Sequence, residues 1–104
     1  MTDQTIGDVR YVIFHKPGPR WQAGVDFRDQ PGVMDHVAHY RQLLEQEKLV
    51  LGGPFMDTLV GGMMIPIAGL SMEEIVEFAA LDPAVRGGLL IFEVHPWYVA
   101  MKKD

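Results

Sequence analysis

The sequence predicts an α+β fold built on one antiparallel sheet. Short apolar stretches typical of strands and longer stretches of helical period alternate in the order strand, helix, strand, strand, helix, strand. The chain has 104 residues, the size of one domain, so residues 1–104 are expected to form a single unit. Hydrophobic residues make up 48% of the chain, which is enough to build one core without disulfides.

Composition and charge argue against several kinds of site and partner. The chain has no cysteine, so disulfides, thiolate metal sites and cysteine nucleophiles are excluded, and a reducing cytoplasm is the expected location. The net charge of −5 and the scattered basic residues argue against nucleic acid. The acidic N-terminal stretch and the short apolar runs predict no membrane span. A small molecule and a second copy of the chain are the expected partners.

The first strand is predicted from alternation. In residues 10–15, RYVIFH, one face carries Tyr11, Ile13 and His15. The prolines and glycine of residues 17–19 end this strand. Residues 1–8, which precede it, are expected to be disordered or to form an arm.

A helix is predicted after Pro31, ending near Lys48. Proline is favoured at a helix start, and apolar residues follow at helical spacing. These apolar residues are Val33, Val37, Tyr40, Leu43 and Leu44.

The next two apolar runs, residues 49–55 and 61–67, predict a hairpin. They are too short for helices and are separated by turn residues, either Asp57 with Thr58 or Gly61 with Gly62. The LGGPF sequence within the first run lacks the lysine and the following helix of a phosphate-binding loop. Its glycines are expected to let two chain segments approach closely.

The second helix is predicted from a capping box. Ser71 can accept from the backbone N–H of Glu74, whose side chain can reach back to Ser71, and this helix is expected to run to about Leu81. Asp82 followed by Pro83 starts a new turn. Residues 88–101 then predict a long final strand, and Pro96 within it indicates a sheet edge.

This order of elements predicts a ferredoxin-like βαββαβ fold, with both helices on one face of the sheet. The last strand is apolar on both faces, with Leu90, Phe92 and Val94 on one side and Leu89 and Ile91 on the other. A second copy packed sheet to sheet would cover the remaining face, so we expect a homodimer.

His36 and His39 lie three residues apart in the first predicted helix. His36 falls within the apolar stripe that faces the sheet, and His39 lies beside that stripe. Burial statistics favour a core histidine for His36 and a boundary residue for His39. A shared metal ion would need at least a third protein ligand, and the spacing of His15 and His95 supplies none, so no metal is expected.

The pattern of His36, then KLVLGGPF, then Asp82-Pro83 and a final strand ending EVHPW resembles the YCII-related (YciI-like) family. The similarity extends from about residue 10 to residue 101. It implies a dimeric α+β barrel, and it implies that His36 and Asp82 match the family's proposed catalytic histidine and aspartate. Some similar proteins act on ring substrates, such as dehydrochlorinases of chlorinated hydroxyquinols, and muconolactone isomerases share the barrel.

One departure from that family is the long connection over residues 16–32. It is expected to be either a lid over a pocket or an arm that packs on a partner subunit. As a lid, Trp21 and Phe27 would cover a ligand, and Arg20 or Arg28 would meet an anionic group. The predicted substrate-binding residues are Arg20, Trp21, Tyr40, Gly53, Pro54 and Phe55.

The chemistry of the proposed pair follows from elementary arguments. A histidine in the first turns of a helix feels the positive end of the helix dipole, which favours neutral imidazole, a base at pH 7. Asp82 accepting the ring N–H of His36 would fix the tautomer. Asp82 is equally suited to cap the turn over residues 83–86, and its two oxygens allow both roles.

No serine or cysteine nucleophile lies in a recognisable motif, which favours proton abstraction followed by elimination or isomerisation over acyl transfer. The function predicted is therefore that of a small-molecule enzyme without a cofactor, in which His36 and Asp82 are the catalytic residues. The alternative is a barrel that binds a small ligand without catalysis.

Overall fold

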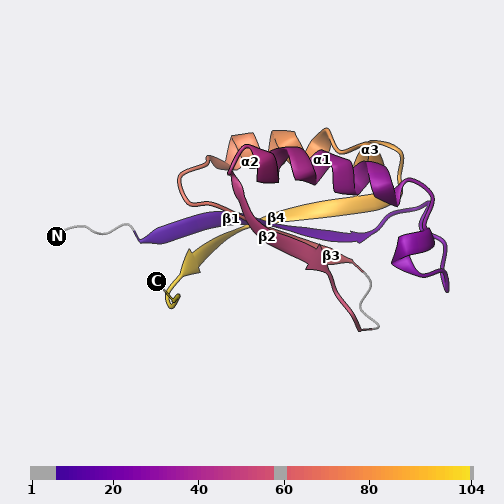
Figure 1. Ribbon diagram of the computed structural model, residues 1–104, viewed down its shortest axis with the longest axis horizontal. Coiled ribbons are helices and arrows are strands. Elements are labelled where there is room, and N and C mark those ends of the chain that lie inside the picture. Colours follow the sequence, from indigo (N-terminus) through magenta and orange to yellow (C-terminus); the bar gives the residue numbers. More distant parts are fainter. Residues whose placement is uncertain (1–6, 58–60, 104) are drawn as a thin grey trace.

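The computed structural model describes residues 7–57 and 61–103, and its strands form one antiparallel sheet (Figure 1). The strands lie in the order β2-β3-β1-β4, which is the ferredoxin-like arrangement predicted from the order of elements. The bounds are β1 Asp8–Pro17, η2 Phe27–Asp29, α1 Val33–Glu45, β2 Leu49–Pro54, β3 Gly62–Pro66, α2 Met72–Ala80, α3 Pro83–Arg86 and β4 Leu90–Val99.

The long pairing of β1 with β4 forms one half of the sheet. Its register runs from Asp8 opposite Val99 to Pro17 opposite Leu90. Among the described residues β4 pairs with β1 alone, so it is an edge strand, as Pro96 predicted. On the other side of β1, His15 lies opposite Gly62 of β3, which places the first histidine of the chain beside the β2–β3 hairpin.

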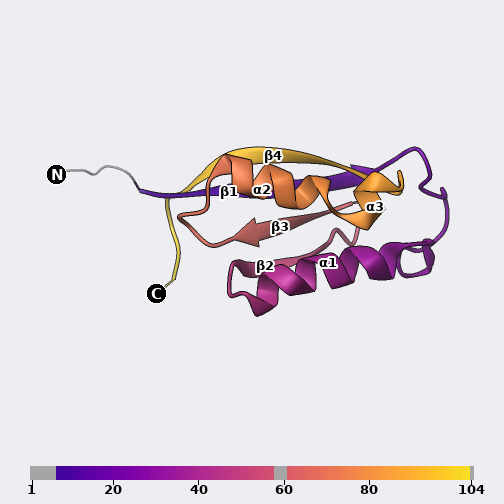
Figure 2. The same cartoon turned by 90° about the horizontal axis from the view of Figure 1, so that it is seen from above.

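All the α-helices lie on one face of the sheet, and the core fills the space between them (Figures 1 and 2). Figure 2 shows α2 lying over β1 and β4, with α1 beside it along β2. Ile13 of β1 is fully buried in this core. The buried cluster around it is formed by Tyr40, Leu43, Ile75 and Ala79.

The helix ends follow local chemistry. The predicted capping box is present, since Ser71 Oγ accepts from Glu74 N at 3.1 Å and Glu74 Oε1 accepts from Ser71 N at 3.0 Å. Helix α1 ends at Glu45, earlier than the predicted end near Lys48. Glu47 adopts a left-handed φ of 61°, which no residue inside a right-handed helix can adopt.

Two sequence predictions concern segments that lie partly outside the described residues. Strand β1 begins at Asp8, two residues before the predicted start, and residues 1–6 lie outside the described residues. The predicted turn at Asp57 and Thr58 falls partly outside them as well. The second candidate turn, Gly61 with Gly62, is wrong in part because Gly62 already belongs to β3. Over 7–57 and 61–103, no helix has the length and apolar character that crossing a bilayer requires.

Candidate functional site

A short hydrogen bond between His36 and Asp82 joins two parts of the helix layer. His36 lies in the first turns of α1, and Asp82 lies between α2 and α3. The distance from His36 Nδ1 to Asp82 Oδ2 is 2.6 Å, and Asp82 is fully buried. A carboxylate only accepts hydrogen bonds, so the proton of this bond lies on His36 Nδ1, and in the neutral form of the ring the lone pair is then on Nε2. The predicted contact between the two side chains is present.

Asp82 also has the structural role that the sequence predicted. Its Oδ1 accepts from Ala84 N at 2.9 Å, and Pro83 occupies the first position of α3. Both oxygens are therefore engaged, one by the helix cap and one by His36. The cap holds the carboxylate in place, which fixes the direction of the oxygen that meets the imidazole.

His15 and Tyr40 belong to the same buried polar group, and the sequence did not predict their contact. Tyr40 lies one turn after His36 in α1, and its Oη is 3.3 Å from Nε2 of His15 on β1. The rings of His15 and His36 meet edge to face, with their centroids 4.7 Å apart. His15 is 3% exposed and Tyr40 is 2% exposed. Alternation predicted that His15 shares one face of its strand with Tyr11 and Ile13, but only the tertiary structure brings that face under α1.

Burial shifts the pKa values of both residues. It lowers the pKa of His15 from 6.5 to about 4, because the imidazolium form loses its hydration, and the nearby His36 adds to the effect. Burial also raises the pKa of the Tyr40 hydroxyl, with the negative Asp82 contributing. At pH 7, His15 is a neutral imidazole and Tyr40 is a neutral phenol.

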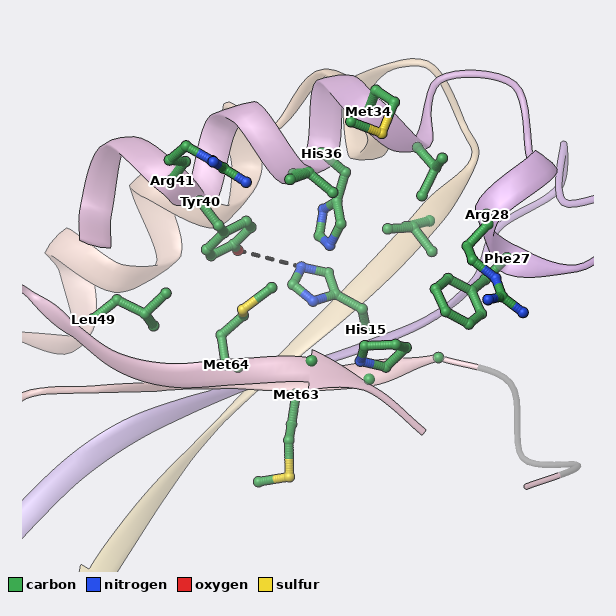
Figure 3. Close-up of a pocket in the computed structure, with 18 of the residues that line it drawn as sticks. His15, Phe27, Arg28, Met34, His36, Tyr40, Arg41, Leu49, Met63 and Met64 are labelled. Carbon is green, nitrogen blue, oxygen red and sulfur yellow. Dashed lines mark hydrogen bonds between the residues drawn. The ribbon is translucent and has the colours of Figure 1, made fainter. Parts of the chain in front are cut away.

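A pocket of about 370 Å³ opens beside this group, between α1 and the strands β2 and β3 (Figure 3). Its volume lies in the range of small-molecule sites. His15, His36 and Tyr40 line it on one side. The other walls are mainly apolar, including Val33, Val37, Leu44, Leu49, Met64 and Leu90.

The predicted binding residues divide into two groups. Trp21, Tyr40, Gly53 and Pro54 line this pocket, whereas Arg20 and Phe55 are not among its lining residues. The backbone N–H of Arg20 donates to Gly88 O at 2.9 Å, and that of Phe55 donates to Gly61 O at 2.8 Å.

The basic residues that line the pocket are Arg28 and Arg41. Figure 3 places Arg28 beside Phe27 on the η2 side of the pocket and Arg41 beside Tyr40 on α1. Arg28 is paired with Asp26 at 2.9 Å. Of the two arginines predicted to meet a ligand, Arg20 and Arg28, the one that lines the pocket is therefore Arg28.

The connection over residues 16–32 is held in shape by one buried side chain. Gln30 is 2% exposed, and its amide nitrogen donates to the carbonyl oxygens of Gln22 at 2.8 Å and Val25 at 2.9 Å. Its oxygen accepts from Gln22 N at 2.9 Å. These bonds fold the connection into a compact loop, which places Trp21 and Phe27 at the pocket. No periodic pattern in the sequence pointed to Gln30.

His39 lies outside the pocket and joins the two long helices. Its Nε2–H donates to the carbonyl oxygen of Phe78 in α2 at 2.7 Å, and the two rings stack with centroids 4.1 Å apart. This contact agrees with the prediction that His39 is a boundary residue.

His15, His36 and Asp82 also bring together the residue types that bind first-row metal ions. One ligand atom from each residue lies within 4.8 Å of the others. An ion about 2.1 Å from each ligand atom would hold any two of them within about 4.2 Å. Coordination by both His36 Nδ1 and Asp82 Oδ2 would replace the hydrogen bond that now joins these two atoms.

The approach of β3 to the site depends on Gly61. Its φ is +128°, and a Cβ atom there would overlap the backbone carbonyl of His15. At Gly69, with φ +98°, a Cβ atom would meet open space. Gly69→Ala is expected to lower the free energy of unfolding by about 1–2 kcal/mol, the cost of the left-handed backbone. Gly61→Ala is expected to cost about 1–3 kcal/mol more, because it adds overpacking.

Urea denaturation of the two glycine variants measures this difference. Equal losses for Gly61→Ala and Gly69→Ala would mean that β3 moves freely away from His15.

The sequence matches no family model, and no match appears among curated proteins. The fold and the site together define the class to which the chain belongs. It is a small ferredoxin-like α+β domain with a buried group of His15, His36 and Asp82 beside an apolar pocket.

Proposed function

We propose that this protein is an enzyme that moves a proton on a small, uncharged or weakly charged ring compound, with His36 as the general base. The observation that carries the proposal is the 2.6 Å bond from His36 Nδ1 to Asp82. His36 lines the pocket and Asp82 does not, so the ring edge turned away from Asp82 is the one available to a ligand. That edge carries Nε2, the basic nitrogen.

The chemistry follows from this arrangement. His36 Nε2 takes a proton from a carbon next to a carbonyl group, and the imidazolium that forms is stabilised by the buried carboxylate of Asp82. The proton then returns to another carbon, which is an isomerisation, or a leaving group departs, which is an elimination. A mainly apolar pocket favours a ligand with a ring or alkyl body.

The experiment that tests this function measures exchange of carbon-bound hydrogen. Small ring ketones and lactones are incubated with the protein in deuterium oxide, and loss of the hydrogen next to the carbonyl group is followed by NMR. Exchange faster than in buffer supports a general base in the pocket. Binding without exchange supports the alternative, a small-ligand-binding protein.

We also propose that the chain belongs to the YCII-related family. The support is the order of the elements around the sheet and the contact between the two residues that the resemblance matched to its catalytic pair. The ring substrates of some similar proteins fit the size and apolar character of the pocket.

We further propose a homodimer in which two sheets pack face to face. Alternation along the strands turns a set of apolar side chains away from the helices. Leu51, Ile91 and Trp97 in this set are 58%, 47% and 43% exposed, and an apolar surface of this kind favours association. On this face Val12 is already buried within the chain, and the other apolar residues are Phe14, Leu51, Met63, Ile65, Ile91 and Trp97.

Leu51→Asp is expected to convert the dimer to a monomer at micromolar concentration, because it would bury a carboxylate between the sheets. Met72→Asp is the matched control. Met72 is 43% exposed at the start of α2, where a negative charge is favourable. Analytical ultracentrifugation distinguishes the two variants, and a monomeric parent protein would refute the dimer.

A further inference from the structure

The site contains a second pair of polar groups that the proposed proton transfer does not use. Tyr40 and His15 are joined by the 3.3 Å contact between Oη and Nε2, which Figure 3 shows facing the pocket. Their rings also contact that of His36, with centroids 5.2 Å and 4.7 Å away. The pair therefore lies directly beside the proposed base.

His15 has one nitrogen without a partner. Its Nδ1 is buried and makes no hydrogen bond, and among the described residues it is the only buried side-chain nitrogen or oxygen in that condition. Buried polar groups normally have partners, so an exception needs an explanation. The explanation depends on where the protons of the pair lie.

The pair holds two protons and uses one of them internally. Since His15 is a neutral imidazole and Tyr40 a neutral phenol, there is one N–H and one O–H. If Tyr40 donates to Nε2, the N–H lies on Nδ1 with no acceptor. If His15 donates from Nε2, Nδ1 keeps only a lone pair and the Tyr40 O–H is free to point elsewhere. Orphaned buried N–H groups are rarer than unsatisfied acceptors, which favours the second arrangement.

The free donor then faces the pocket. Tyr40 lines the pocket together with His36, and the walls around them are mostly apolar. We propose that the Tyr40 hydroxyl, oriented by the N–H of His15, binds the oxygen atom of the ligand beside His36 Nε2. The ligand class is a ring ketone or lactone whose oxygen becomes an enolate, or a phenol that resembles it. The proposal rests on the proposed function for the identity of the reacting oxygen.

The step balances without any co-reactant. His36 Nε2 takes a proton from the carbon beside the carbonyl group, and the electron pair of the broken C–H bond forms a C=C bond. The π pair of the carbonyl group moves to its oxygen, and this oxyanion accepts from Tyr40 O–H. When the proton returns from His36 to a carbon that is conjugated with the enolate through a second C=C bond, that double bond shifts and the carbonyl group forms again. Tyr40 touches the reacting oxygen, whereas His15 acts through Tyr40 and is a positioning residue.

The test uses 4-nitrophenol and nitrobenzene as probes, which differ only in the hydroxyl group. Calorimetry gives both dissociation constants, and visible absorbance gives the ionised fraction of the bound phenol. The parent protein is expected to prefer 4-nitrophenol by about tenfold or more, because a hydrogen bond to a charged oxygen in an apolar site is strong. Tyr40→Phe is expected to remove most of this preference and to lower the ionised fraction.

His15 is tested by two replacements. His15→Leu is expected to reduce the preference about tenfold, because Tyr40 loses the donor that orients it. His15→Gln keeps an N–H donor and is expected to restore most of the preference. His39→Gln is the control on the same helix as Tyr40, outside the pocket, and is expected to leave the preference unchanged. Nitrobenzene affinity reports in every variant whether the pocket is intact.

Three results would overturn the proposal: no binding of 4-nitrophenol, equal affinity for both probes in the parent protein, or an unchanged preference in Tyr40→Phe. All three results concern binding affinity and not the exchange of carbon-bound hydrogen. A failure here therefore leaves the role of His36 and Asp82 standing, and a failure of hydrogen exchange leaves this binding role standing.

Discussion

His36→Ala is expected to lower catalysed hydrogen exchange by about 10²-fold or more, because it removes the only base that the proposal assigns. His36 lines the pocket, its Nδ1 is bound to Asp82, and the remaining nitrogen is the one that meets the ligand. His39→Ala is the matched control on the same helix. It breaks the contact with Phe78 outside the pocket, so it is expected to reduce stability without reducing exchange.

Asp82→Asn is expected to have a similar effect on exchange while leaving the fold intact. Asparagine caps helices well, so its oxygen can still accept from Ala84 N. Its NH₂ group then faces His36 Nδ1, which must become the acceptor, and the proton moves to Nε2. The base is therefore blocked by the wrong tautomer.

A double variant tests whether the two residues act as a unit. Adding Asp82→Asn to His36→Ala is expected to cost little further, because residues that act together show strongly non-additive effects. NMR exchange rates for the single and double variants measure this. If His36→Ala leaves exchange intact and only weakens ligand binding, the protein is a binder and His36 is part of the pocket wall.

The protein is expected to lose about 3 kcal/mol of its free energy of unfolding as the pH falls through the range between 6.5 and about 4, because of His15. Burial lowers the pKa of His15 in the folded state to about 4, while the unfolded chain keeps the ordinary value of 6.5. In this range the unfolded state binds a proton that the folded state does not, so stability falls as the pH falls.

Urea unfolding at about pH 7.5 and about pH 4.5, at a fixed protein concentration, measures this loss. His15→Gln has no group that titrates here and is expected to show a flatter dependence. His95→Gln is the control, since the His95 side chain is 56% exposed. Hydrogen bonds to arginine lower the pKa values of Asp8 and Asp26 below their usual 3.8, so these groups contribute at lower pH. The same slope in the parent protein and in His15→Gln would contradict the role of His15.

Local patterns were enough to predict most of the fold. Alternation predicted β1, helical spacing predicted α1, and Ser71 with Glu74 predicted the start of α2, because these signals act between residues close in the chain. The ends of the elements were harder to predict, because they depend on backbone conformations that these local signals do not specify. The end of α1 depends on the left-handed φ of Glu47, to which no residue type in that stretch pointed.

The candidate site required contacts between distant residues. The contact of His36 with Asp82 was expected from the family resemblance, and Asp82 as a helix cap followed from the proline beside it. His15 was assigned no role, because only the pairing of β1 with β3 brings it under α1. The role of Gln30 depends on how residues 16–32 fold back on themselves.

The sequence by itself determined the order of the elements, the helix caps at Ser71 and Asp82, and which residues share a face of β1, because each depends on residues within a few positions of one another. Only the tertiary structure decided that His15, Tyr40, His36 and Asp82 share one buried site beside an apolar pocket. Strand register and helix packing set those distances. Both depend on burial of the whole core, which no single segment of the sequence specifies.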